Sequence, residues 1–133
     1  MTHASSFVEL FPQSAWLAST MIYHCIRYTI DPHKLADFET YARRWMEGGI
    51  IRRCGGDPLG YFLPKKGFGG ADNIAIALIG FKSLAAYEEY RKKIGEDPDS
   101  RENLAHAERS CCILVEDRSY FYRIAGSDPE KES

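Results

Sequence analysis

The stretch NIAIALIGF, residues 73–81, is apolar at nearly every position. Its aliphatic and aromatic side chains are typical of a β-strand. The large side chains Ile74, Ile76 and Leu78 would share one face of this strand, and the residues between them are also apolar. A strand with one wet face would instead alternate apolar and polar residues. The stretch therefore predicts the centre of a sheet that needs cover on both sides.

Two further strands and a helix are predicted on the N-terminal side of this stretch. Residues 22–30, IYHCIRYTI, are rich in β-branched and aromatic types and predict a strand. Asp31 and Pro32 then predict the start of a helix, because Asp can cap free N–H groups and Pro fits the first turn. An apolar stripe at spacings of three and four continues this helix for about 20 residues. Residues 59–64 predict the strand that follows it.

Two helices and a last strand are predicted on the C-terminal side. Ser83 is a candidate cap for a helix that ends at Gly95. Asp97 is the candidate cap of a further helix, which is expected to run to about Cys112. Residues 118–124 are rich in tyrosine and phenylalanine and predict the final strand.

The order of these elements, strand–helix–strand twice over, is that of a ferredoxin-like α+β protomer. Helices in this order cover only one face of a four-stranded sheet. The other face, with residues 73–81 near its centre, would be a large exposed apolar patch on a monomer. The sequence therefore predicts a homodimer in which a second copy covers that face.

Length and charge exclude several classes of protein. The chain has 133 residues, with 17 Lys and Arg against 19 Asp and Glu and a net charge of −2 at pH 7. This length fits one domain, and the charge balance argues against a nucleic-acid partner. No apolar run approaches the roughly 18 residues that cross a bilayer, so no membrane partner is expected.

Composition divides the chain into three segments. We expect a flexible N-terminal extension over residues 1–20, a domain over residues 21–124 and a disordered polar tail over residues 125–133. A translation start assigned too far upstream would also explain the extension, since Met21 directly precedes the first strand. The alternative is a short docking segment built on Phe7, Leu10, Phe11 and Trp16.

The cysteines and histidines predict a reduced protein without a metal. Four cysteines are present, and no two of them form a CxxC pair. Cys111 and Cys112 are adjacent, which rarely suits a mutual disulfide. We interpret the four thiols as reduced side chains of a cytoplasmic protein. The four histidines show no metal-ligand spacing, so we expect no metal and no cofactor.

Six segments together form a pattern that runs in one order along the chain. They are residues 26–35, Gly55-Gly56, residues 60–64, residues 81–88, Asp97-Pro98 and residues 116–119. This pattern resembles the small bacterial members of the NIPSNAP family. The resemblance implies a dimeric α+β barrel and no firmly assigned biochemical activity. Relatives in the wider superfamily include cofactor-free monooxygenases, isomerases and heme enzymes. Many bacterial members carry two histidines where this chain has Pro58 and Leu59, so a role built on such a pair is not expected here.

The candidate site residues come from the first strand, the first helix and the second strand. Trp45 belongs to the apolar stripe of the helix, so core packing is its first interpretation. If the space between helices and sheet opens into a pocket, Trp45, Tyr61 and Arg27 would combine apolar surface with polar tips and bind a ligand. His24 is the candidate general base, because its reference pKa lies near neutrality.

Two functions follow from these residues. The first is a homodimeric NIPSNAP-family protein that binds a small hydrophobic ligand or has a structural role, without turnover. The alternative is a cofactor-free monooxygenase or isomerase acting on a small hydrophobic or aromatic molecule. In that enzyme Arg27 or Tyr61 would stabilise a developing oxyanion and His24 would move a proton.

Overall fold

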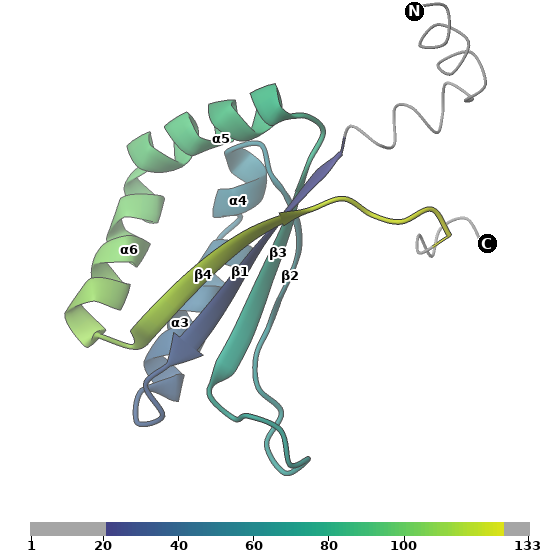
Figure 1. Ribbon diagram of the computed structural model, residues 1–133. Coiled ribbons are helices and arrows are strands. Elements are labelled where there is room, and N and C mark those ends of the chain that lie inside the picture. The colour runs from purple at the N-terminus through teal and green to yellow at the C-terminus, as the bar shows by residue number, and fades with distance from the viewer. Residues whose placement is uncertain (1–20, 127–133) are drawn as a thin grey trace, which may run out of the picture.

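Strands and helices alternate along the chain in two similar halves (Figure 1). The computed structural model describes residues 21–126. The elements are β1 (Ile22–Ile30), α3 (Leu35–Met46), α4 (Ile50–Arg53), β2 (Asp57–Phe62), β3 (Ile74–Phe81), α5 (Leu84–Glu96), α6 (Pro98–Ser110) and β4 (Ile113–Phe121). The helices thus follow β1 and β3, as the order of a ferredoxin-like unit requires.

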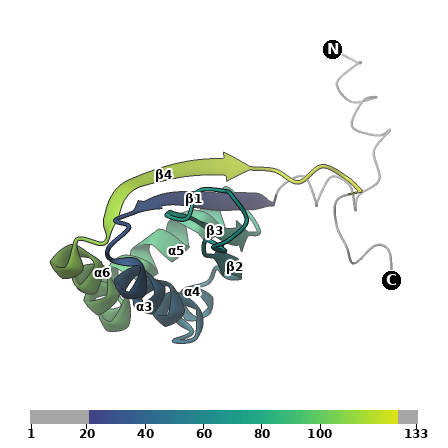
Figure 2. The ribbon, with the colours of Figure 1, turned by 90° about the horizontal axis from the view of Figure 1, so that it is seen from below.

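The four strands form one sheet in the order β2-β3-β1-β4, and every neighbouring pair is antiparallel. This order places β1 and β3 at the centre and β2 and β4 at the edges. Figure 2 shows α3, α4, α5 and α6 together on one face of the sheet. The predicted ferredoxin-like α+β fold is confirmed.

The core lies between the helices and the covered face of the sheet. Alternate side chains of the two central strands point into it, and the buried ones are His24, Ile26, Tyr28, Ile30, Ala75, Ala77, Ile79 and Phe81. The buried side chains of α3 are Phe38, Tyr41, Ala42 and Trp45. Two alanines in β3 leave room for aromatic rings in this layer. Among these rings, Tyr28 packs edge-on against Phe38, with ring centroids 4.9 Å apart.

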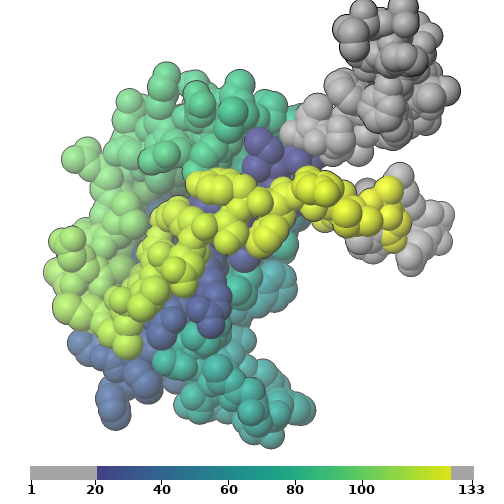
Figure 3. Space-filling view, viewed as in Figure 1, coloured from purple at the N-terminus to yellow at the C-terminus, as the bar shows by residue number. Residues whose placement is uncertain are grey.

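The opposite face of the sheet is not covered by any part of residues 21–126. Ile74, Ile76 and Leu78 lie on this face and are only partly buried. The edge strands add Phe62, which is 56% exposed, and Phe121, which is 52% exposed. Figure 3 looks onto this face, with β4 as the yellow band across it. The sequence predicts that both faces of β3 are covered. Within a single chain, the helices cover only one of them.

The helix after β1 is shorter than the sequence pattern predicts. Its N-cap is Lys34, and it ends at Met46. Asp31 is not the cap, because its carboxylate accepts the backbone N–H of His33 at 2.9 Å in the preceding turn. Gly49 has a φ of +71°, a left-handed conformation that interrupts the helix and separates α3 from α4. The predicted single helix of about 20 residues is therefore wrong.

Two strands begin earlier than predicted. β2 starts at Asp57 rather than Leu59, and β4 starts at Ile113 rather than Arg118. The reason in β4 is the end of α6, where Cys111 has a left-handed φ of +54° and turns the chain directly into the sheet. The tyrosine-rich segment from which the strand was predicted forms only its second half.

Both caps predicted in the second half of the chain are confirmed. The Ser83 hydroxyl accepts the backbone N–H of Ala86 at 3.1 Å and caps α5. The Asp97 carboxylate accepts the N–H groups of Asp99 and Ser100 at 2.9 and 3.0 Å and caps α6. These bonds satisfy N–H groups that have no partner within the helix.

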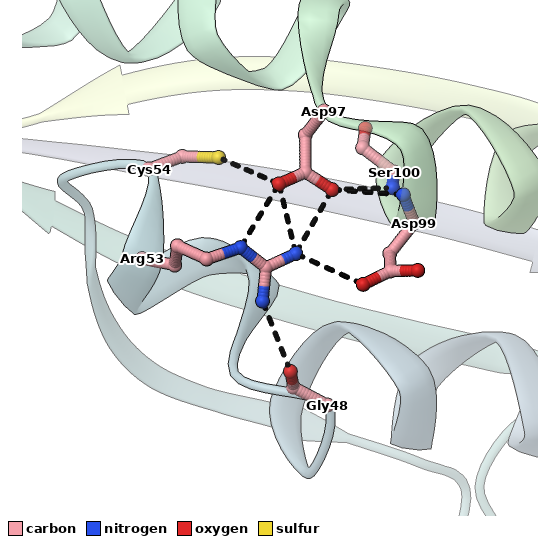
Figure 4. A network of polar contacts seen from close by, with 6 residues as sticks. All are labelled: Gly48, Arg53, Cys54, Asp97, Asp99 and Ser100. Atoms are coloured by element: carbon pink, nitrogen blue, oxygen red, sulfur yellow. Dashed lines mark hydrogen bonds and ion pairs between the residues drawn. The ribbon is translucent and has the colours of Figure 1, made fainter.

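Asp97 also joins α6 to α4 through an ion pair (Figure 4). The Arg53 guanidinium donates to both carboxylate oxygens at 2.9 Å and reaches Asp99 at 3.2 Å. The backbone N–H of Ser100 and the Arg53 guanidinium hold the pKa of Asp97 below its usual value. The carboxylate therefore fixes the helical layer that forms one wall of the site described below.

Replacing Asp97 with alanine is expected to lower the free energy of unfolding by about 1–2 kcal/mol, because α6 loses its N-cap. Asp97→Asn keeps a capping oxygen and should lose less than half of that amount. Urea unfolding of both variants beside the unchanged protein measures the difference. Equal losses in the two variants would assign the effect to the ion pair with Arg53 and not to the cap.

The ends of the chain fall outside this description. The predicted extension, residues 1–20, lies outside the described residues, as does the predicted tail from residue 127 onward. Every helix and strand from β1 to β4 falls within residues 21–124. Within the described range, no helix is both long enough and apolar enough to cross a membrane.

Candidate functional site

A cavity of about 390 Å³ lies between the helical layer and the sheet. Its size falls within the range of about 300–1,000 Å³ that is common for small-molecule sites. The lining residues are His24, Ile26, Tyr28, Tyr41, Trp45, Ile51, Tyr61, Ile79, Tyr87, Tyr90, Arg91, Ile94, Gly95, Leu104, Arg118 and Tyr120. Aromatic and aliphatic side chains dominate this set, and a few polar groups are placed among them. Half-exposed Leu104 and exposed Gly95 belong to the part of the lining that meets solvent.

One part of the wall is a group of tyrosines around Trp45. Tyr28 and Tyr61 stack and join their hydroxyls at 3.1 Å. Burial raises the pKa of both phenols well above the usual value. Tyr41 meets the Trp45 ring edge-on, with centroids 5.8 Å apart, and burial raises the Tyr41 pKa to about 12. These phenols are therefore neutral at physiological pH.

Trp45 is both a core residue and a wall of the cavity. Its side chain is 6% exposed and packs in the cluster of buried residues. Its indole N–H has no hydrogen-bond partner within residues 21–126. A side-chain interaction with Trp45 partly offsets the rise in the Tyr41 pKa. A buried N–H of this kind is costly unless another molecule satisfies it.

His24 lies in another part of the wall, where β1 meets β4. Its ring stacks on Tyr120 at 4.8 Å and meets Tyr87 edge-on at 5.5 Å. Nε2 lies 3.4 Å from Nη1 of Arg118, and Nδ1 has no partner within the described residues. Burial, followed by the charges of Arg118 and Arg91, lowers the pKa of His24 to about 4. The imidazole is therefore neutral at physiological pH.

Two arginines supply the charge of the lining. Arg118 is half exposed and pairs with Glu116, while its other terminal nitrogen faces His24. Arg91 of α5 is exposed and makes no hydrogen bond or ion pair within residues 21–126. No Asp or Glu belongs to the cavity lining. The charges in contact with the cavity are thus positive.

The structure brings three of the four candidate residues to this cavity. Trp45, Tyr61 and His24 line it, whereas Arg27 lies on the uncovered face of the sheet. There Arg27 faces Asp117 across β1 and β4, with a nitrogen–oxygen distance of 3.7 Å. The expectation that Arg27 shares a pocket with Trp45 and Tyr61 is corrected, because β1 turns odd-numbered side chains away from the helices.

Most residues at the polar end of the cavity were not predicted from the sequence. Arg118 and Tyr120 reach it because β4 pairs with β1, which sets Tyr120 opposite His24. Arg91 reaches it from α5. The sequence feature that could have indicated Arg118 and Tyr120 is the alternation of side chains along the last strand, which places these two residues on the same face. Within residues 21–126, no group of three His, Cys, Asp or Glu side chains could hold a metal ion.

Acid is expected to destabilise the fold through His24. The folded-state pKa of about 4 lies below the reference value of 6.5, so between these values the unfolded chain binds a proton that the folded chain does not. Stability should therefore fall as the pH drops from about 6.5 to 4, by at most about 1.4 kcal/mol per pH unit from this group.

Urea unfolding at several pH values in this window measures that slope. His24→Gln keeps a polar side chain that does not titrate, so its slope should be shallower than that of the unchanged protein. Parallel slopes in the two proteins would contradict the buried, neutral state of His24.

Fold and cavity together define a ferredoxin-like α+β protein with an aromatic pocket between its two layers. The NIPSNAP family model matches residues 23–127, and the chain therefore belongs to the NIPSNAP family. No curated protein matches the chain.

Solved structures with the same fold include bacterial NIPSNAP proteins. An uncharacterised NIPSNAP-like domain protein from Burkholderia xenovorans has a TM-score of 0.68 and 19% identity, over 84% of this chain and 91% of that one. A NIPSNAP family protein with unknown function from Agrobacterium tumefaciens has a TM-score of 0.67 and 21% identity, over 82% and 93%.

A more distant neighbour carries an enzyme name. A putative antibiotic biosynthesis monooxygenase from Bacteroides thetaiotaomicron has a TM-score of 0.58 and 18% identity, over 84% of this chain and 97% of that one. Identities this low show a shared fold alone. The biochemical activity of this NIPSNAP-family protein is therefore unassigned by its relatives.

Proposed function

We propose that this protein is a cytoplasmic homodimer that binds a small aromatic molecule in the cavity between its helices and its sheet. The observation that carries the proposal is the lining, where tyrosines and Trp45 surround about 390 Å³ and two buried nitrogens lack partners. Aromatic walls favour stacked or edge-on contacts with an aromatic ring. A ligand that also reaches the nitrogens of His24 and Trp45 would remove the cost of leaving them unpaired.

Binding without turnover is better supported than catalysis. A cofactor-free monooxygenase or isomerase needs a base with a pKa near the working pH. Burial and two arginines lower the pKa of His24 to about 4, which makes its ring a weak base. The Tyr61 hydroxyl is paired with Tyr28, and no carboxylate lines the cavity. These features favour a binding protein over an enzyme.

The uncovered face of the sheet supports the homodimer. Ile74, Ile76 and Leu78 form a row there, and Phe62 extends it onto β2. A contiguous apolar surface of this kind is uncommon on a soluble monomer. A second copy offers the same row, which suits the self-complementary contact of a twofold dimer.

The cysteines support a reducing compartment. All four are free thiols, including the adjacent Cys111 and Cys112. Burial raises the pKa of Cys54 and of Cys25, so these two thiols are less reactive than usual. Thiols kept in this state are typical of cytoplasmic proteins.

Calorimetric titration with 1-naphthamide, an uncharged two-ring molecule, tests the binding function. We expect saturable binding with one site per chain. Leu104→Trp enlarges a half-exposed side chain of the lining and should weaken binding by at least about tenfold, a change of about 1.4 kcal/mol. Leu84→Trp is the matched control, because Leu84 is 60% exposed on α5 and does not line the cavity. Equal weakening by both variants, or no binding of this molecule and of its charged analogues, would overturn the proposal.

A further inference from the structure

Two fully buried nitrogens of the cavity lining, in His24 and Trp45, have no hydrogen-bond partner within residues 21–126. Arginine cannot accept a hydrogen bond, so the contact of 3.4 Å makes Nε2 of His24 the acceptor and Arg118 the donor. In a neutral imidazole the other nitrogen then carries the proton. Nδ1 of His24 is therefore an N–H donor without an acceptor among residues 21–126, on a residue that is 2% exposed.

Trp45 adds a second donor of the same kind. Indole nitrogen can only donate. Trp45 is 6% exposed, and no atom of the described part of the chain accepts from its N–H. No tyrosine hydroxyl within residues 21–126 accepts from either nitrogen, and Tyr28 pairs with Tyr61. In the same way Tyr87 pairs with Tyr120 at 2.8 Å. A ligand that satisfies these two nitrogens must bring acceptor atoms.

The charge of the lining points to an anion. Arg118 is balanced by Glu116, whereas Arg91 has no ion pair within residues 21–126. No acidic side chain lines the cavity to attract a cation. One unbalanced guanidinium matches a ligand with a single negative charge better than a doubly charged phosphate. A carboxylate has that charge and supplies two acceptor oxygens.

We propose that the ligand of this cavity is an aromatic carboxylate, whose ring packs among the tyrosines and Trp45 and whose carboxylate is held beside Arg91. This assignment rests on the proposed function and adds the chemical class of its ligand. The carboxylate accepts from Arg91 and from the free N–H of His24. Such charge-assisted bonds are stronger than those of a neutral acceptor, and the site therefore prefers the anion over an uncharged molecule of the same shape.

Calorimetry with three naphthalene derivatives separates charge from shape. The probes are 1-naphthoate, 1-naphthamide and 1-naphthylmethylammonium at neutral pH. We expect 1-naphthoate to bind at least about tenfold more tightly than 1-naphthamide, and the ammonium to bind most weakly. Equal binding of naphthoate and naphthamide would overturn the carboxylate assignment and leave the proposed binding function standing. Failure of all three to bind would overturn both.

Two variants locate the anion within the site. Arg91→Gln removes an exposed charge with no partner, so the fold should be unaffected. It should remove most of the preference for naphthoate while changing naphthamide binding by less than about twofold. Lys92→Gln is the control, because it removes one charge from the next residue of the same helix, outside the lining. An equal loss of naphthoate affinity in both variants would show general attraction of anions and overturn the role of Arg91.

Discussion

Replacing Trp45 with alanine is expected to lower the free energy of unfolding by about 3–5 kcal/mol, as measured by urea unfolding. The ring is buried to 94% of its surface, since it is 6% exposed, and packs against Tyr41 and the core. Removing it would join new empty space to the existing cavity, which collapse of the surrounding side chains could fill only in part. A loss this large is a substantial fraction of the stability of a typical small domain.

Trp45→Phe is the control for this experiment. Phenylalanine keeps most of the ring packing and removes the indole N–H that has no acceptor. The two effects oppose each other, so the loss should stay below about 1.5 kcal/mol. A loss below about 1 kcal/mol for Trp45→Ala would show that the ring is only loosely packed and would contradict its place in the core.

Ile76→Asp is expected to convert the proposed homodimer to a monomer. Ile76 lies at the middle of the uncovered face, between Phe62 on β2 and Arg27 on β1. In a dimer formed through this face, the new carboxylate would be buried against the second copy. Its neighbour Arg27 already faces Asp117, so the added charge would be only partly balanced, and burying it is costly. Sedimentation velocity at micromolar concentration measures the change in mass.

The matched control for this substitution is Leu84→Asp. Leu84 is 60% exposed on α5, on the other side of the sheet, so a charge there should leave the dimer intact. The unchanged protein should also unfold with a midpoint that rises with protein concentration, and Ile76→Asp should lose that dependence. A folded Ile76→Asp variant that remains a dimer would contradict the role given to this face.

The fold was predictable because its main signals are local. The apolar run over residues 73–81 forms β3, and the caps at Ser83 and Asp97 begin α5 and α6. The wrongly predicted element bounds lie where the backbone conformation of a single residue ends a helix or starts a strand. Gly49 interrupts the first helix and Cys111 starts β4 early, and neither left-handed residue breaks the side-chain pattern around it.

The site was predictable only in part because the sheet assembles it. Alternation along β1 separates His24 from Arg27, but it does not say which of the two faces the helices. Packing of α3 beneath the sheet settles this and brings His24 to the same cavity as Trp45 and Tyr61. Arg91 and Arg118 join them from segments far along the chain. Such contacts depend on strand register, which hydrophobic pattern alone does not assign to particular partners.

The most direct test of the ligand cavity is a ¹⁵N–¹H correlation spectrum of the protein titrated with 1-naphthoate. The chain contains two tryptophans, so the spectrum has two indole N–H signals, and Trp45→Phe identifies the one from Trp45. We predict that naphthoate shifts the Trp45 signal progressively to saturation. A Trp45 signal that stays unchanged at saturating naphthoate would contradict the account.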